Sequence, residues 1–184
     1  FSEGNTDSML RAASTAMRIG ICTPILLGNE EMIEKRAKRL GISLDGIEIV
    51  NPRHDREADR RHEFALKLAQ KRQRQGVTYP EALENMFDRN YFGMMMVEER
   101  LADAIICGTY SSNPLPGEIA KEVIGIRPCY KHFASLHIVD TQKGILFIAD
   151  TAINQATDED TLFDIARLAR NSVEFFSHDP NIAM

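Results

Sequence analysis

Ala102-Asp103-Ala104-Ile105-Ile106-Cys107-Gly108-Thr109 is the stretch that decides the fold of this 184-residue chain. A short apolar run that ends at a glycine is typical of a buried strand in a parallel sheet, which is covered on both faces. The residues that follow predict a loop and then a short helix over 116–124. We therefore expect a parallel strand over 102–107 that leads into a ligand-binding loop.

The chain before this stretch alternates between helical and strand-like patterns. Apolar residues recur at three- and four-residue steps in the helical segments, and short apolar runs end at Gly28-Asn29 and Asn51-Pro52. Alternating strands and helices build a doubly wound, mostly parallel α/β sheet with helices on both faces. The expected elements are a helix over 6–20, a strand over 22–27, a helix over 30–40, a strand over 47–50, a long and largely solvated helix over 55–75, a helix that opens at Thr78 and a buried helix over 91–97.

The pattern changes after Gly125, because two strand-like runs over 133–139 and 144–149 are joined by a short turn-rich link. We expect these runs to form an antiparallel hairpin. A long amphipathic helix over 157–177 follows, and Ile182-Ala183-Met184 would begin a further strand. The predicted domains are residues 1–132, a first α/β domain, and residues 133–184, the start of a second α/β domain that opens with the hairpin.

Charge and composition exclude several classes of protein. The 22 Lys and Arg residues against 27 Asp and Glu give a net charge of −5, which argues against nucleic-acid binding as the main role. No apolar run approaches the roughly 20 residues needed to cross a bilayer. Cys22, Cys107 and Cys129 have no metal-ligand spacing and apolar neighbours, so we expect reduced, buried thiols in a cytoplasmic protein without a membrane segment or a metal site.

The loop after the strand over 102–107 is the first candidate for a binding site. Glycine lets a ligand approach the backbone, and hydroxyl groups with turn amides could hold an anion. A plain strand-to-helix turn remains the alternative. The loops over 3–6 and 28–30 are weaker candidates, since acidic residues in both disfavour a phosphate. The candidate ligand-binding residues of the first loop are Gly108, Thr109, Tyr110, Ser111 and Ser112.

Seven segments in a specific order and spacing extend over nearly the whole chain. They are Phe1-Ser2-Glu3-Gly4, Ile25-Leu26-Leu27-Gly28, Glu48-Ile49-Val50-Asn51-Pro52, Gly76-Val77-Thr78, Tyr91-Phe92-Gly93-Met94-Met95-Met96-Val97, Ala102-Asp103-Ala104-Ile105-Ile106-Cys107-Gly108 and Phe147-Ile148-Ala149-Asp150-Thr151-Ala152-Ile153-Asn154. Together these segments resemble the phosphate acetyltransferase and butyryltransferase family. They most resemble its members that form the C-terminal half of large hybrid malic enzymes.

The resemblance implies two α/β domains with a cleft between them, and a family domain that continues beyond Met184. The family transfers an acetyl group between coenzyme A and phosphate with the help of arginines, a serine and an aspartate. Arg72 matches one family arginine, which precedes the Gly-Val-Thr motif, so the resemblance implies that Arg72 helps to bind acyl-CoA or phosphate. Glu118 occupies the position of a second family arginine. A carboxylate there would repel an anionic substrate and remove stabilisation of charge in the transition state.

This departure leaves two main alternatives for the function, besides a purely structural role in which the chain only builds the oligomer through its apolar helices. In the first, the chain is a non-catalytic, acetyl-CoA-sensing and homo-oligomerising module of a malic enzyme, which converts malate to pyruvate and carbon dioxide. The NAD(P) and the Mg or Mn ion would then bind the malic-enzyme half of the same polypeptide, and no cofactor would bind this chain. In the second, the chain belongs to an active phosphate acyltransferase that uses acyl-CoA as substrate.

Overall fold

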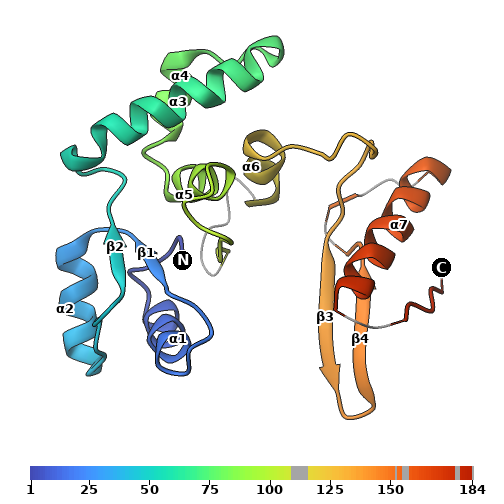
Figure 1. Cartoon of the computed structure of the whole chain (residues 1–184), viewed down its shortest axis with the longest axis horizontal. Helices are drawn as coiled ribbons and strands as arrows, with labels where there is room; N and C mark the ends of the chain where they lie inside the picture. The colour runs from blue at the N-terminus through green and yellow to red at the C-terminus, as the bar shows by residue number, and fades with distance from the viewer. Residues whose placement is uncertain (109–115, 152, 155–157, 177–178, 184) are drawn as a thin grey trace. The chain divides into compact units, whose positions relative to one another are not determined.

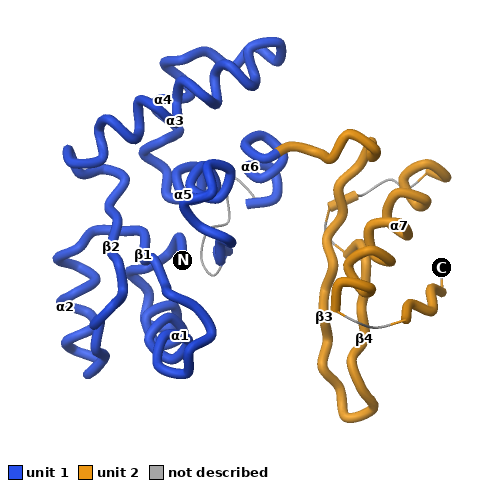
Figure 2. Tube along the Cα trace, in the orientation of Figure 1, with its two compact units in different colours: residues 1–124 blue, residues 125–184 orange. Residues whose placement is uncertain are grey.

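The computed structural model describes residues 1–108, 116–151, 153–154, 158–176 and 179–183. Two compact units make up the chain, Phe1–Ile124 and Gly125–Met184 (Figure 2). The domain boundary predicted at residues 132 and 133 falls inside the second of these units.

The order of elements confirms the predicted α/β class (Figure 1). Helices and strands alternate at the start of the first unit, and further helices follow. The elements of the first unit are α1 (Asp7–Arg18), β1 (Ile25–Leu27), α2 (Glu30–Leu40), β2 (Glu48–Val50), α3 (Ala58–Arg72), α4 (Tyr79–Asn85), α5 (Arg89–Glu98) and α6 (Pro116–Val123). The elements of the second unit are β3 (Leu136–Thr141), β4 (Gly144–Ala149) and α7 (Glu159–Phe175).

The parallel sheet is built around β1, which pairs in parallel with β2. Residues 1–4 run along the other edge of β1. The Phe1 nitrogen donates to the Ile25 carbonyl at 2.8 Å, and the Leu27 N–H donates to the Phe1 carbonyl at 2.9 Å. This alternation of donor and acceptor around one residue is the pattern of a parallel pair.

The prediction of a regular strand over 102–107 is wrong, because the structure has no regular secondary structure there. The Ser2 N–H donates to the Ile106 carbonyl at 3.0 Å, so this stretch lies beside residues 1–4. Among the described backbone hydrogen bonds, this is the one that ties residues 102–108 to the sheet, and one bond does not make a ladder. The segment therefore occupies a strand position without strand pairing.

Helices cover both faces of the parallel pair, as predicted. Leu26 points to one face, where it packs with Leu10 of α1 and Ile33 of α2. Its neighbour Leu27 points to the opposite face, because side chains alternate along a strand. The second face carries the larger core, which draws on α3, α4, α5 and α6 and contains Val50, Phe64, Ala65, Leu68, Ala69, Ala82, Met86, Phe92, Met94, Met95, Met96, Ile119 and Val123.

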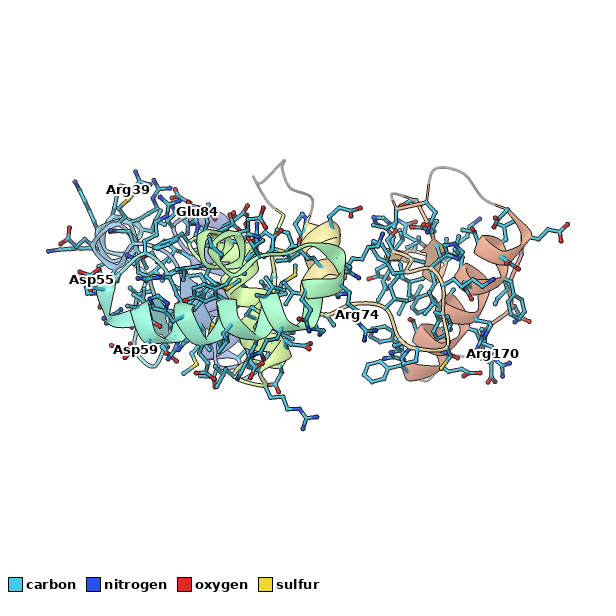
Figure 3. All side chains as sticks on the ribbon, turned by 90° about the horizontal axis from the view of Figure 1, so that it is seen from above. Arg39, Asp55, Asp59, Arg74, Glu84 and Arg170 are labelled. Carbon is cyan, nitrogen blue, oxygen red and sulfur yellow. The ribbon has the colours of Figure 1, made fainter. Side chains whose placement is uncertain are left out.

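Helix α3 is less solvated than its charged sequence predicts. Phe64 and Leu68 are each 1% exposed, whereas Leu66 faces solvent. The charges follow the helix dipole, since Asp59 lies in the first turn and Arg74 follows the helix end (Figure 3). The apolar stripe is therefore narrow but fully buried.

The prediction of a buried α5 is confirmed.

The second unit contains the predicted antiparallel hairpin, with Leu136 opposite Ala149 and Thr141 opposite Gly144. Helix α7 packs against β4, and its N-cap Asp158 accepts a hydrogen bond from the Thr161 N–H at 2.8 Å. The predicted strand from Ile182 is wrong for residues 179–183, which have no regular secondary structure.

The prediction that the cysteines are buried is also wrong for two of them. Cys22 and Cys129 are exposed because both lie in loops, and Cys107 is half-buried. All three thiols are free.

Within the described ranges, none of the helices combines the length and the apolar character that a membrane crossing requires.

Candidate functional site

The loop predicted to bind a ligand is described only at its first residue. Gly108 is exposed and has φ +94°, a left-handed conformation that favours glycine. This geometry fits a sharp turn at the end of the strand-like segment. Thr109, Tyr110, Ser111 and Ser112 lie outside the described residues, so their role as ligand-binding residues stays a prediction.

Arg72 lies against the C-terminal end of α6. Its Nε donates to the Glu122 carbonyl at 2.5 Å, and its Nη2 donates to the Lys121 carbonyl at 2.8 Å. The last carbonyls of a helix lack intrahelical partners and carry partial negative charge, so a guanidinium at this place stabilises the helix end. A ligand-binding role for Arg72 remains a prediction, and the described contacts are structural.

Two further side chains hold α6 in place. Lys71 Nζ donates to the Val123 carbonyl at 2.8 Å, and the Tyr91 hydroxyl donates to Glu122 Oε2 at 2.7 Å. Burial, together with the nearby Glu122 carboxylate, raises the pKa of Tyr91, so the phenol remains protonated and can donate. Glu118, in the first turn of this fixed helix, is exposed.

A polar cavity of about 440 Å³ lies at the carboxyl ends of β1 and β2. Residues that follow three of the strand-like segments line this cavity: Asn5 after residues 1–4, Gly28 and Asn29 after β1, and Asn51 after β2. Arg53 and Arg89 add two guanidinium groups. The carboxyl edge of a parallel sheet is the usual place for a ligand in an open α/β fold.

Sequence reasoning undervalued this cavity because acidic residues stand in two of its loops. Glu3 is buried, and Glu30 Oε2 forms an ion pair with Arg56 Nη2 at 3.1 Å, so the charge of Glu30 is compensated. A usable signal was present in the sequence. An asparagine stands at the end of each of three strand-like segments: Asn5 directly follows residues 1–4, Asn29 follows β1 after Gly28, and Asn51 directly follows Val50.

The second unit contains a carboxylate with an unusually full set of donors. Asp150, directly after β4, accepts hydrogen bonds from the Ser135 N–H and hydroxyl, from the Ile153 N–H, and from the backbone and side-chain nitrogens of Asn154. Burial alone would raise the pKa of Asp150, but the bonds from Ser135 and Asn154 outweigh it and lower the pKa. Asp150 thus anchors the loop after β4 to the start of β3.

In the part of the chain that the structure describes, no three His, Cys, Asp or Glu side chains gather closely enough to hold a metal ion.

Comparison with known proteins places these features in a family. The sequence pattern of the family described as "Phosphate acetyl/butaryl transferase" matches residues 1–184. The chain is 30% identical to the phosphate acetyltransferase of Bacillus subtilis over 184 residues, which cover 100% of this chain and 56% of that protein. It is also 30% identical to the NADP-dependent malic enzyme of Escherichia coli, over 99% of this chain and 24% of that enzyme.

A solved structure supports the same relationship. The phosphotransacetylase of Streptococcus pyogenes superposes on 100% of this chain and 55% of its own length, with a TM-score of 0.87 and 28% sequence identity. The chain therefore spans about half of these two transferases and about a quarter of the malic enzyme. The fold, the order of motifs and the match over the entire sequence show that this chain belongs to the phosphate acetyl/butyryl transferase family.

Proposed function

We propose that this chain is the phosphate acetyltransferase-like region of a malic enzyme, where it binds acetyl-CoA as a regulatory effector and contributes to a homo-oligomer. The full-length cytoplasmic protein would oxidatively decarboxylate malate with NAD(P) and a divalent metal bound outside this chain. The similarity to a malic enzyme over 99% of the chain supports this parentage.

The single observation that carries the regulatory proposal is the exposed carboxylate of Glu118. The family resemblance assigns an arginine to this position, and α6 is held by Lys71, Arg72 and Tyr91. These contacts hold the C-terminal end of α6, and Ile119 and Val123 of the same helix are buried. A carboxylate there opposes the charge that builds up on a phosphate or thioester during acyl transfer.

Acyl transfer is the second candidate, and a specific observation favours it. The chain is as similar to a phosphate acetyltransferase as it is to a malic enzyme, at 30% identity in both cases. The family resemblance also matches Arg72 to an arginine of the family. In this alternative the family reaction proceeds without the second arginine, with acyl-CoA and phosphate as substrates.

Calorimetric titration of acetyl-CoA into the full-length protein tests the regulatory proposal. We expect saturable binding and, in a parallel assay, a change in the rate of malate oxidation on addition of acetyl-CoA. Such coupling is reciprocal, so malate should also change the affinity for acetyl-CoA. Absence of both heat and a thermal shift would contradict the proposal and leave a purely structural, oligomer-building role.

A further inference from the structure

A second cavity, of about 390 Å³, lies within the second unit. It is lined by residues from the segment 125–134, which precedes the hairpin, and from the end of α7. Its volume is within the range of small-molecule sites. None of its lining residues is among the positions that the family resemblance singles out, which are Arg72, residues 108–112 and Glu118. A ligand bound here would therefore be additional to the substrates of the family.

Aromatic rings form much of the wall of this cavity. Tyr130 and Phe133 come from the segment before the hairpin. Phe175 and Phe176 come from the end of α7, where their rings meet edge to face with centroids 5.5 Å apart. Phe175 is nevertheless 83% exposed and Phe176 47% exposed. Exposed apolar side chains that gather beside a cavity are typical of a binding site, and aromatic walls favour a ligand with an aromatic ring.

The protein fixes the Tyr130 ring without a ligand. The guanidinium carbon of Arg167 lies 4.7 Å from the centre of this ring, and Asn171 Nδ2 donates to the Tyr130 hydroxyl at 2.8 Å. A ring that is already held loses little conformational freedom when a ligand packs against it. This part of the wall is therefore formed before a ligand binds.

Two further polar side chains of the wall are also engaged within the protein. His132 Nδ1 lies 3.2 Å from Asp164 Oδ2, and the same oxygen accepts from the His132 N–H at 3.2 Å. The Ser172 hydroxyl donates to the Leu168 carbonyl at 2.9 Å. These contacts hold both side chains in place, so neither of them is the main polar group left for a ligand.

Arg127 is the polar side chain that is left for a ligand. It is exposed, and among the described contacts its guanidinium forms neither a hydrogen bond nor an ion pair. Of the described residues that line the cavity, none carries a carboxylate. A guanidinium presents its N–H groups in a fork that matches the two oxygens of a carboxylate. One unpaired positive charge thus fits a ligand with one negative charge.

We propose that this cavity binds a small aromatic carboxylate, whose ring packs against Tyr130, Phe175 and Phe176 and whose carboxylate pairs with Arg127. The aromatic walls select the ring, and the charge of Arg127 selects the acid over a neutral compound of the same shape. This site is separate from the proposed binding of acetyl-CoA, so either proposal can fail without the other.

Titration calorimetry of the full-length protein, at constant ionic strength, tests this proposal. The probe is indoleacetate. Tryptophol has the same ring with an alcohol in place of the acid, acetate has the carboxylate without a ring, and AMP has a ring with a phosphate. The variants are Arg127→Gln and Phe175→Ala. Arg170→Gln is the matched control, because Arg170 is an exposed arginine of α7 that does not line the cavity (Figure 3).

We expect indoleacetate to bind more tightly than tryptophol, acetate or AMP. Its affinity should fall about tenfold or more in Arg127→Gln, as the loss of a charge-assisted hydrogen bond predicts. It should fall about threefold or more in Phe175→Ala through loss of a ring contact, and stay unchanged in Arg170→Gln.

Four results would overturn the proposal: no binding of indoleacetate at millimolar concentrations, equal affinity in the wild type and Arg127→Gln, equal affinity for indoleacetate and tryptophol, or tighter binding of AMP, which would assign the cavity to a nucleotide. Both variants should fold. Arg127 is exposed without a described side-chain partner, and Phe175 is mostly exposed.

Discussion

The two units of this chain bury their apolar residues to very different extents. In the first unit, helices cover both faces of the parallel pair, and Phe64 and Phe92 are 1% and 0% exposed. In the second unit, one helix covers one face of a two-stranded hairpin, and Leu146 and Phe175 are 55% and 83% exposed. An apolar side chain is buried only where a second layer covers it.

Two hydrogen-bonded carboxylates join separate segments of the second unit. Asp150 ties the loop after β4 to the start of β3. Asp164 of α7 accepts bonds from the backbone N–H groups of Lys131 and His132 and from the His132 ring. These bonds join segments far apart in the sequence, as the core does in the first unit. The comparison predicts that the first unit responds to core truncation and the second to loss of carboxylate charge.

Truncation of Phe64 to alanine should have the largest effect. The ring packs at 5.2 Å from that of Phe92, and its removal leaves a cavity that the surrounding helices cannot fill. We expect the free energy of unfolding to fall by about 3–5 kcal/mol, measured by urea denaturation. The matched control is Phe175→Ala in the exposed last turn of α7, which should change it by less than about 0.5 kcal/mol. Equal effects of the two substitutions would contradict the comparison.

Replacement of Asp150 by asparagine should destabilise the second unit selectively. The substitution exchanges one acceptor oxygen for an NH₂ group facing the donors of Ser135 or Asn154, at a cost of about 2 kcal/mol. Hydrogen exchange should accelerate in the hairpin and remain unchanged in α3 and α5. Asp140→Asn, an exposed substitution on the same hairpin, is the control. Unchanged hydrogen exchange in Asp150→Asn would show that the Asp150 carboxylate does not anchor the loop after β4.

Acidification should destabilise the second unit for the same reason. The pKa of Asp150 is lowered by its hydrogen bonds despite burial, and that of Asp164 is lowered mainly by the backbone N–H of Lys131. A carboxylate with a lowered folded pKa stabilises the protein above its unfolded pKa, and this stabilisation disappears as the pH falls through the folded value. Hairpin protection should therefore decrease progressively as the pH falls from about 5 to about 2, measured by pulsed hydrogen exchange. Protection that stays constant over this range, or that decreases equally in Asp150→Asn, would contradict this explanation.

Loss of a helix cap should have the smallest effect. Thr78 and Glu81 form a reciprocal capping box at the start of α4, with Thr78 N–H to Glu81 Oε2 at 3.0 Å. Thr78→Ala should lower the free energy of unfolding by about 1 kcal/mol, well below the effect of Phe64→Ala. Thr15→Ala, an exposed substitution within α1, is the control. A loss as large as that of Phe64→Ala would mean that capping matters as much as the core.

The sequence predicts the fold where the signal is local. Periodicity at three and four residues predicts α1, α2 and α7, and a turn-rich link predicts the hairpin, because both patterns depend on neighbours in the chain. The strand over 102–107 failed because pairing depends on a distant segment. The Ile106 carbonyl accepts a hydrogen bond from the Ser2 N–H, and the local sequence pattern does not predict how many backbone hydrogen bonds form between these two segments.

The candidate cavity could be predicted only in part. Glycine and asparagine after the strands mark the correct edge of the sheet, yet the acidic neighbours pointed away from a phosphate. The sequence does not show that Arg56 pairs with Glu30, or that Arg89 from α5 reaches Asn5. Convergence of side chains from separate segments is a property of the tertiary structure.

The most direct test of the proposed function measures release of coenzyme A when the full-length protein is incubated with acetyl-CoA and phosphate. Glu118 at the start of α6 leads us to expect binding of acetyl-CoA without release of coenzyme A above the uncatalysed rate. Release at a rate typical of an enzyme would contradict the regulatory account and favour acyl transfer.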